Sequence, residues 1–85
     1  MYYVYLIVSN TSKRKWISYV GYTNDLKKRL TLHNNSKGAK FTRGRKWYLA
    51  YSKKYDKKSI AMKEEYKLKK DFKMRSKLKN SFLTK

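Results

Sequence analysis

Two short runs of β-branched and aromatic residues near the start of the chain constrain its fold more than any other feature. Residues 2–8 read YYVYLIV and residues 16–22 read WISYVGY. Such runs favour β-strands, because branched and aromatic side chains pack well on a pleated surface. Residues 9–15 between them, SNTSKRK, are polar and turn-prone. The two runs are therefore predicted to pair antiparallel as a hairpin.

The next segment predicts a helix, a loop and a third strand. The cluster Thr23-Asn24-Asp25 offers N-capping side chains before the sequence LKKRLTLHNN, which predicts a helix over roughly residues 25–34. Residues 35–46 hold two of the three glycines and several basic side chains without a sustained period, which is typical of a loop. Residues 47–55, WYLAYSKKY, predict a strand.

The C-terminal third predicts two helices. Residues 56–59 could cap a long helix that continues to about residue 72, because this stretch has good helix formers and no Gly or Pro. The tail, residues 73–85, could add a short helix with Met74, Leu78 and Phe82 on one face. The order is then β-β-α-β-α-α, an α+β arrangement, and residues 1–85 are expected to form a single domain.

Charge limits the class of partner. The chain has 24 Lys plus Arg against 5 Asp plus Glu, a formal net charge of +19, which favours association with polyanions. Nucleic acid is the expected partner, although lysines that serve only to solvate the surface would give the same composition. The lack of Cys excludes disulfides, thiol nucleophiles and thiolate zinc sites, and it fits a reducing, cytoplasmic location.

Two polar residues share the apolar face of the first predicted helix. At 100° per residue, Leu26, Arg29, Leu30 and His33 lie within one narrow arc. Groups that face a core need partners to offset their desolvation, so Arg29 and His33 are candidates for a site at the rim of the core. The alternative is a snorkelling Arg and a hydrogen-bonded His at the edge.

The long predicted helix places carboxylates near its own apolar stripe. Ile60, Ala61, Leu68 and Phe72 form the stripe, and Glu64 and Glu65 fall within or beside it. In a chain so poor in acidic residues, one of them is a candidate ligand for a hard divalent cation such as Mg²⁺. Ion pairs within the helix, Glu64 with Lys67 or Glu65 with Lys69, are the alternative. Helical phase does not choose between the two glutamates.

Strand alternation brings a glycine and several tyrosines together. Tyr3 and Tyr5 share one face of the first strand, and Tyr19 and Gly21 share one face of the second. Tyrosines in strands usually serve packing alone. Gly21 is more informative, because glycine weakens a strand interior and often marks a close backbone approach or a bulge.

These residues together resemble the motifs of the GIY-YIG nucleases. In that family two short strand motifs precede a helix with an Arg and a later helix with a Glu, and the resemblance covers residues 2 to about 72. The quoted segments are Tyr3-Val4-Tyr5, Tyr19-Val20-Gly21, the pair Arg29 and His33, and Ala61-Met62-Lys63-Glu64-Glu65-Tyr66. The loop Lys37-Gly38-Ala39-Lys40-Phe41-Thr42-Arg43 is similar to the small stand-alone bacterial subgroup and, more distantly, to the junction-cutting branch. Tyr3 stands where the family's first motif opens with glycine, and a C-terminal family Asn could correspond to Asn80.

The resemblance implies a three-stranded antiparallel sheet flanked by helices and a metal-dependent endonuclease. It implies that Tyr5, Tyr19, Arg29, His33 and Glu65 converge over the sheet as catalytic residues, with one Mg²⁺ or Mn²⁺ ion on Glu65. Arg29 would stabilise charge on the phosphate through its planar fork. Tyr5 would deprotonate or orient the water, with Tyr19 and His33 in positioning roles, and its pKa would have to be lowered by adjacent cations.

Basic loops are expected to grip the phosphate backbone independently of sequence. The residues are Lys13, Arg14, Lys15, Lys37, Lys40, Arg43 and Arg45. The predicted function is hydrolysis of phosphodiester bonds in nucleic acid, with DNA as the expected substrate. The substrate is expected to be chosen by its structure and not by its sequence, as in repair or recombination. The alternatives are a non-catalytic basic binding module that uses aromatic stacking, and a nuclease subunit that depends on a protein partner.

Overall fold

The computed structural model describes residues 1–11 and 15–84 and has the predicted order of elements. Three strands and three helices follow one another along the chain: β1 (Tyr2–Asn10), β2 (Trp16–Thr23), α1 (Leu26–Asn34), a 3-10 turn η1 (Lys40–Thr42), β3 (Tyr48–Tyr55), α2 (Lys58–Lys70) and α3 (Phe72–Leu83). The sheet is antiparallel with the strand order β2-β1-β3. The predicted α+β class and the three-stranded antiparallel sheet are therefore confirmed.

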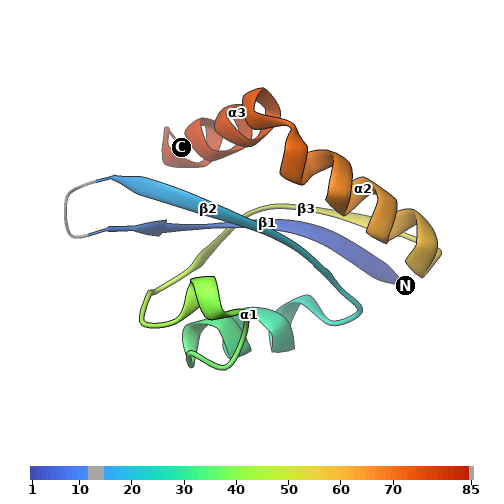
Figure 1. The fold of residues 1–85 in the computed structure, drawn as a ribbon, viewed down its shortest axis with the longest axis horizontal. Coiled ribbons are helices and arrows are strands. Elements are labelled where there is room, and N and C mark those ends of the chain that lie inside the picture. The colour runs from blue at the N-terminus through green and yellow to red at the C-terminus, as the bar shows by residue number, and fades with distance from the viewer. Residues whose placement is uncertain (12–14, 85) are drawn as a thin grey trace.

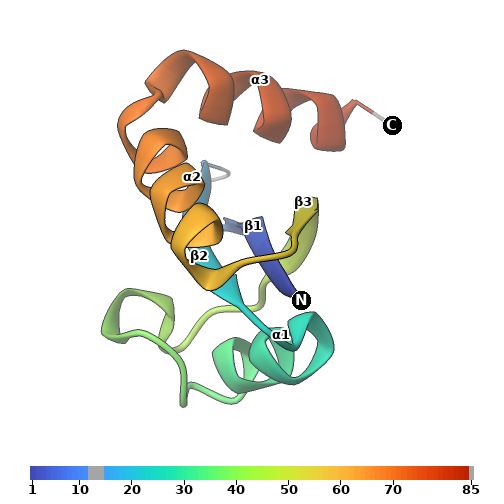
Figure 2. The same ribbon diagram turned by 90° about the vertical axis from the view of Figure 1, so that its right-hand side faces the viewer.

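The sheet forms the middle of three layers. Figures 1 and 2 show α1 and the loop before β3 on one side of the sheet, and α2 and α3 on the other. Because β1 is the central strand and both of its faces are covered, every residue from Val4 to Ser9 is buried. This explains the continuous apolar run in the sequence, since a strand that is covered on both faces has no solvent side.

Strand alternation divides the core between the two faces. Val4, Leu6 and Val8 belong to a cluster that includes Ala61 of α2. Tyr5, Ile7 and Trp47 form a second cluster, packed with leucines of α1. The second face also carries three candidate site residues, Tyr5, Tyr19 and Gly21, since the register pairs Tyr5 with Gly21 and Ile7 with Tyr19.

The helix boundaries follow from local capping. The Asp25 side chain accepts a hydrogen bond from the Lys28 N–H at 3.1 Å and starts α1, as predicted. In the same way Asp71 accepts from Met74 N–H at 3.0 Å and starts α3. For that reason α2 ends at Lys70, and the prediction that it continues to about residue 72 is wrong.

Two members of the predicted apolar stripe on the long helix are not buried. Ala61 is fully buried and Leu68 packs against the core, whereas Ile60 is 44% exposed and Phe72 is 69% exposed. Phe72 lies beyond the end of α2, so it no longer shares the helical phase that placed it on the stripe. None of the helices in the described residues has the length and apolar character needed to cross a bilayer.

Candidate active site

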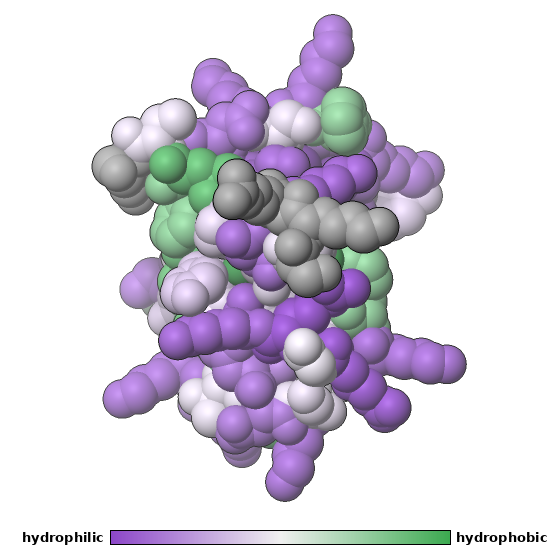
Figure 3. Space-filling view, turned by 90° about the vertical axis from the view of Figure 1, so that its left-hand side faces the viewer, coloured by the Kyte–Doolittle hydropathy of each residue, from purple (hydrophilic) through white to green (hydrophobic). Residues whose placement is uncertain are grey.

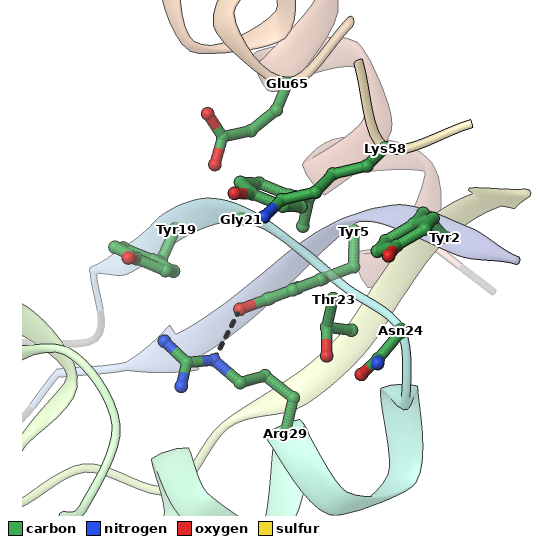
Figure 4. Close-up of a pocket in the computed structure, with 10 residues that line it drawn as sticks. Tyr2, Tyr5, Tyr19, Gly21, Thr23, Asn24, Arg29, Lys58 and Glu65 are labelled. Carbon is green, nitrogen blue, oxygen red and sulfur yellow. Dashed lines mark hydrogen bonds between the residues drawn. The ribbon is translucent and has the colours of Figure 1, made fainter. Parts of the chain in front are cut away.

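A cavity of about 420 Å³ opens at the β2 edge of the sheet. Its wall combines residues of both strands of the hairpin with one residue of α1 and two of α2, so groups from the two faces of the sheet meet at its edge. Figure 4 shows Glu65 on one side of the strands and Arg29 on the other. The lining residues are Tyr2, Tyr5, Tyr19, Gly21, Tyr22, Thr23, Asn24, Arg29, Lys58 and Glu65.

Gly21 lets the Tyr5 side chain reach this cavity. Tyr5 stands on the central strand directly opposite Gly21, so its ring must pass the edge strand to reach the opening. A Cβ atom at Gly21 would lie 2.6 Å from Tyr5 Cζ, closer than two carbon atoms can approach. The group that approaches Gly21 closely is therefore a side chain, the Tyr5 phenol, and not backbone as expected.

The Tyr5 hydroxyl is the first member of a buried hydrogen-bond chain. Its oxygen lies 2.8 Å from His33 Nε2, and His33 Nδ1 lies 2.9 Å from Thr42 Oγ1. The Thr42 hydroxyl has a single proton, which it donates to the Ala39 carbonyl at 2.7 Å. Thr42 must therefore accept from Nδ1–H. This leaves Nε2 with a free lone pair, so the Tyr5 hydroxyl donates its proton to His33.

Burial favours the neutral forms of Tyr5 and His33, the two titratable groups of this hydrogen-bond chain. Desolvation lowers the pKa of His33 below its usual 6.5, and the nearby Arg29 charge lowers it further. Desolvation also raises the pKa of Tyr5 above 10.0, although the hydrogen bond and charge of Arg29 act in the opposite direction. The expectation that cations would lower the Tyr5 pKa is therefore wrong in its net sign, because burial outweighs Arg29.

Residues of the loop after α1 pack around His33 and enclose its ring. A Cβ atom at Gly38 would lie 2.9 Å from His33 Cε1, so only glycine leaves room for the imidazole at that point. Trp47 Nε1 donates to the Thr42 carbonyl at 2.9 Å and fixes the 3-10 turn under the ring. His33 is fully buried and does not line the cavity. It contacts two residues that do, through the hydrogen bond with the Tyr5 hydroxyl and an edge contact with the Tyr19 ring.

Two cations face the cavity from different elements. Arg29 Nε donates to the Tyr5 hydroxyl at 3.5 Å, a long hydrogen bond, and its guanidinium group points into the opening (Figure 4). Lys58, the first residue of α2, extends its ammonium group towards the same opening. Arg29 belongs to the predicted set, whereas no sequence pattern had singled out Lys58.

The structure separates the two glutamates that helical phase left equivalent. Glu65 lines the cavity with a side chain that is 16% exposed, and Glu64 lies outside it with a side chain that is 33% exposed. Both ion pairs weighed from the sequence are present, Glu64 with Lys67 at 3.4 Å and Glu65 with Lys69 at 3.7 Å. The Glu65 pair is loose, so this carboxylate can accept a further ligand from the cavity.

The oxygen groups around the cavity fit one type of metal ion. The described residues contain no group of three or more His, Cys, Asp or Glu side chains close enough to enclose an ion, which does not fit a protein-caged zinc site. One carboxylate, Glu65, shares the cavity with the tyrosines Tyr5 and Tyr19. Such a set suits a hard cation that keeps most of its water and takes its other ligands from a substrate phosphate, as Mg²⁺ does.

The predicted basic residues that the structure describes lie outside the cavity. Lys15 is exposed just before β2, and Lys13 and Arg14 fall outside the described residues. The other four expected phosphate-binding residues are exposed in the loop between α1 and β3: Lys37, Lys40, Arg43 and Arg45. Figure 3 shows that hydrophilic side chains cover most of the face at the hairpin end. Asn80 is exposed on α3 and does not line the cavity.

Four of the five predicted catalytic residues therefore line one cavity, and the fifth, His33, supports it from within the core. They do not converge over one face of the sheet, as expected, but around the edge of β2. Sequence patterns missed Thr42 and Gly38 as partners of His33, although both lie in the loop segment that carries the family resemblance. They also missed Thr23 and Asn24, which precede α1.

Comparison with known proteins places these features in a family. The model of the GIY-YIG catalytic domain matches residues 1–80. A UPF0213 protein from Halobacterium salinarum is 40% identical over 70 residues, which is 81% of this chain and 86% of that protein. A UPF0213 protein from Oceanobacillus iheyensis is 54% identical over 52 residues, which is 60% of each chain.

Other matches are partial. A UPF0213 protein from Bacillus velezensis is 50% identical over 52 residues, 60% of this chain and 52% of that protein. The matched segments thus span less than two thirds of the Oceanobacillus and B. velezensis relatives. The solution NMR structure of a UPF0213 protein from Bacillus halodurans is 31% identical and covers 93% of this chain and 83% of that chain, with a TM-score of 0.45.

Proposed function

The chain belongs to the GIY-YIG nuclease superfamily, and on that premise we propose that it is a metal-dependent endonuclease that hydrolyses phosphodiester bonds in nucleic acid. DNA is the proposed substrate, chosen by its structure and not by its sequence. One observation carries the proposal: Tyr5, Arg29 and Glu65, from three different elements, line one cavity at the edge of the sheet. A binding surface would not need a buried hydroxyl, a guanidinium and a carboxylate at one point.

Arg29 and Lys58 are proposed to bind the scissile phosphate. Both side chains point into the cavity (Figure 4). The guanidinium group can donate two parallel hydrogen bonds to phosphate oxygens and stays charged at all relevant pH values, so it can stabilise the negative charge that develops during the reaction. Lys58 would add a point charge without that directional fork.

Tyr5 and His33 are proposed to deprotonate the attacking water through two linked proton transfers. A water oxygen attacks phosphorus and forms the new P–O bond while one water proton passes to the Tyr5 oxygen. At the same time the Tyr5 proton passes to His33 Nε2. The bond from phosphorus to the leaving oxygen breaks, and the leaving oxygen keeps the electron pair and takes a proton from solvent water. A neutral imidazole is the available base near pH 7, whereas a phenol with a raised pKa is not. This relay removes the need for a tyrosinate.

Glu65 is the proposed ligand of a Mg²⁺ or Mn²⁺ ion. When bound, such an ion supplies Lewis-acid stabilisation of the phosphate and of the leaving oxygen. Tyr19 would hold the Tyr5 and His33 rings in place, since its ring centroid lies 5.3 Å from that of His33 in an edge contact. The exposed basic residues of the loop after α1 would contact the backbone of the nucleic acid outside the cavity.

The test is cleavage by matched variants. Purified protein is incubated with labelled duplex, branched and single-stranded DNA and with RNA in low salt, in Mg²⁺, Mn²⁺ or EDTA. Glu65→Gln and Arg29→Lys should each lower the cleavage rate at least about hundredfold, because Gln lacks the carboxylate that holds the metal ion and Lys lacks the planar fork that binds the phosphate. Glu64→Gln is the matched control, since Glu64 neighbours Glu65 on α2 but does not line the cavity.

The outcomes separate the rival functions. Cleavage that needs a metal ion and is lost in Glu65→Gln but not in Glu64→Gln supports the nuclease. Tight binding by all variants with no cutting of any substrate would identify a binding module instead. Cutting that appears only after a cell extract is added would identify a subunit that depends on a partner.

A further inference from the structure

A second hollow adjoins the cavity along β2. It has a volume of about 250 Å³ and is lined by Ser18, Tyr19, Val20, Phe41, Lys69 and Arg75. Tyr19 lines both spaces, so the two lie next to each other along β2. A linear polymer that enters the first space can therefore continue into the second.

Phe41 presents a large aromatic surface to this hollow. Its side chain is 52% exposed although it lies in a loop rich in basic residues. The ring stacks on Tyr19 with the centroids 6.1 Å apart and an angle of 22° between the planes, and it also lies against Trp47 with the centroids 6.2 Å apart. One face of Phe41 is thus held against other rings. The position of this residue is fixed by its neighbours and does not depend on a ligand.

Cationic groups surround the same hollow. Lys69 Nζ lies 5.9 Å from the centre of the Tyr19 ring and 3.7 Å from the Glu65 carboxylate, so it stands between the two spaces. Arg75 Nε is buried and has no hydrogen-bond partner among the residues that the structure describes. Arg75 also lines the hollow, where its charged guanidinium group can attract a phosphate.

We propose that this hollow binds the base of an unpaired nucleotide next to the scissile phosphate, with the base stacked on Phe41 and its phosphate near Lys69 and Arg75. The inference rests on the proposed function and names its substrate class. An aromatic face accepts any base, because every base has a π-face, which agrees with a choice by structure and not by sequence. A base inside a duplex is already stacked on its neighbours, so the preferred substrate carries a nucleotide outside the stack.

Binding measurements test this proposal without any cleavage. Dissociation constants are measured in EDTA for three DNAs of equal length: a full duplex, a duplex with one unpaired nucleotide, and the same duplex with an abasic residue at that position. Wild-type protein should bind the unpaired nucleotide about tenfold more tightly than the abasic residue, the usual scale of one stacked base. Phe41→Leu should lose this tenfold difference and keep its affinity for the full duplex, while Phe41→Trp should retain it.

Tyr66→Leu is the matched control, since Tyr66 is 57% exposed on α2 and lines neither hollow. It should bind all three DNAs as the wild type does. The proposal is overturned if wild-type protein binds the abasic DNA as tightly as the unpaired nucleotide, a result that does not depend on any variant folding. A stacking preference without cleavage would instead refute the nuclease and leave the base subsite standing.

Discussion

At the scale of single residues, His33 is the most constrained group of the chain. Its two ring nitrogens each have one partner of defined direction, Thr42 as acceptor and Tyr5 as donor. Both bonds suit the neutral ring, and a proton added at Nε2 would meet the Tyr5 hydroxyl proton and the Arg29 charge. The environment therefore selects one tautomer and one charge state.

This environment predicts that acid destabilises the fold through His33. The folded pKa lies below the unfolded value of about 6.5, so the unfolded chain binds more protons in that range. The contribution of His33 to stability is complete above about pH 6.5 and is lost as pH falls towards the folded pKa, by up to about 1.4 kcal/mol per pH unit. Urea midpoints between pH 5 and 8 measure it.

The control uses the fact that the chain has a single His. His33→Gln should unfold at lower urea than the wild type at pH 8, because its hydrogen bonds and packing are altered. Its midpoint should however stay nearly constant between pH 5 and 7. A wild-type midpoint that rises as the pH falls would mean that the folded protein prefers the imidazolium form.

At the scale of elements, one side chain joins α1 to β3. The Asn34 amide accepts from Trp47 N–H at 2.6 Å and donates to the Trp47 carbonyl at 3.2 Å. These bonds close the loop of residues 35–46 at its two ends. They also hold Trp47 under the turn that carries Thr42. The position of His33 thus depends on hydrogen bonds made outside the cavity.

Removal of these two hydrogen bonds should lower stability measurably. Asn34→Ala leaves the Trp47 backbone N–H to find water, which costs about 1 kcal/mol for a partly exposed site. In a domain of this size that corresponds to a fall of about 4–8 °C in Tm. Asn35→Ala, at the neighbouring exposed position, should change Tm far less. Equal Tm values for the two variants would contradict the role of Asn34 as a clamp between α1 and β3.

Local patterns predicted the elements well because each pattern was strong on its own. The uninterrupted runs in β1 and β2 and the capping Asp25 each point to one structure. The end of α2 was missed because Asp71 can continue a helix or cap the next one, and only tertiary packing decides. The 3-10 turn of residues 40–42 was missed because it is held by Trp47, outside the loop.

From sequence patterns alone, the candidate site was predictable only for residues that share a face of the same helix or strand. Phase placed Arg29 with His33, and alternation placed Tyr19 with Gly21, because both rules act within an element. Neither rule says which elements meet at an edge. Helical phase did not choose between Glu64 and Glu65, and the choice of Glu65 came from the family resemblance. The presence of Lys58 needed the packing of α2 against the hairpin.

At the scale of the whole molecule, the net charge of +19 sets how tightly any polyanion binds. The exposed cations are spread over several elements, so only those that touch phosphate release counterions on binding. The loop of residues 35–46 carries Phe41, which lines the second hollow. The opposite edge strand, β3, also carries exposed lysines, which provides an internal comparison.

Salt dependence should separate these two sets of cations. Replacing both Arg43 and Arg45 with Gln should reduce the slope of log affinity against log salt by about 0.9 for each phosphate that is no longer neutralised, close to two in total. Replacing Lys53 and Lys54 of β3 with Gln removes the same charge and should leave the slope nearly unchanged. If the two double variants behave alike, binding is governed by net charge and not by the loop.

The single imidazole also gives the protein a natural spectroscopic reporter. His33 lies beneath the cavity and is joined to it by a hydrogen bond with the Tyr5 hydroxyl. Its ring signals stand apart from those of every other side chain in a nuclear magnetic resonance spectrum, since no second histidine overlaps them. Whatever enters the cavity and alters the Tyr5 hydroxyl is therefore recorded at His33, without any label attached to the chain.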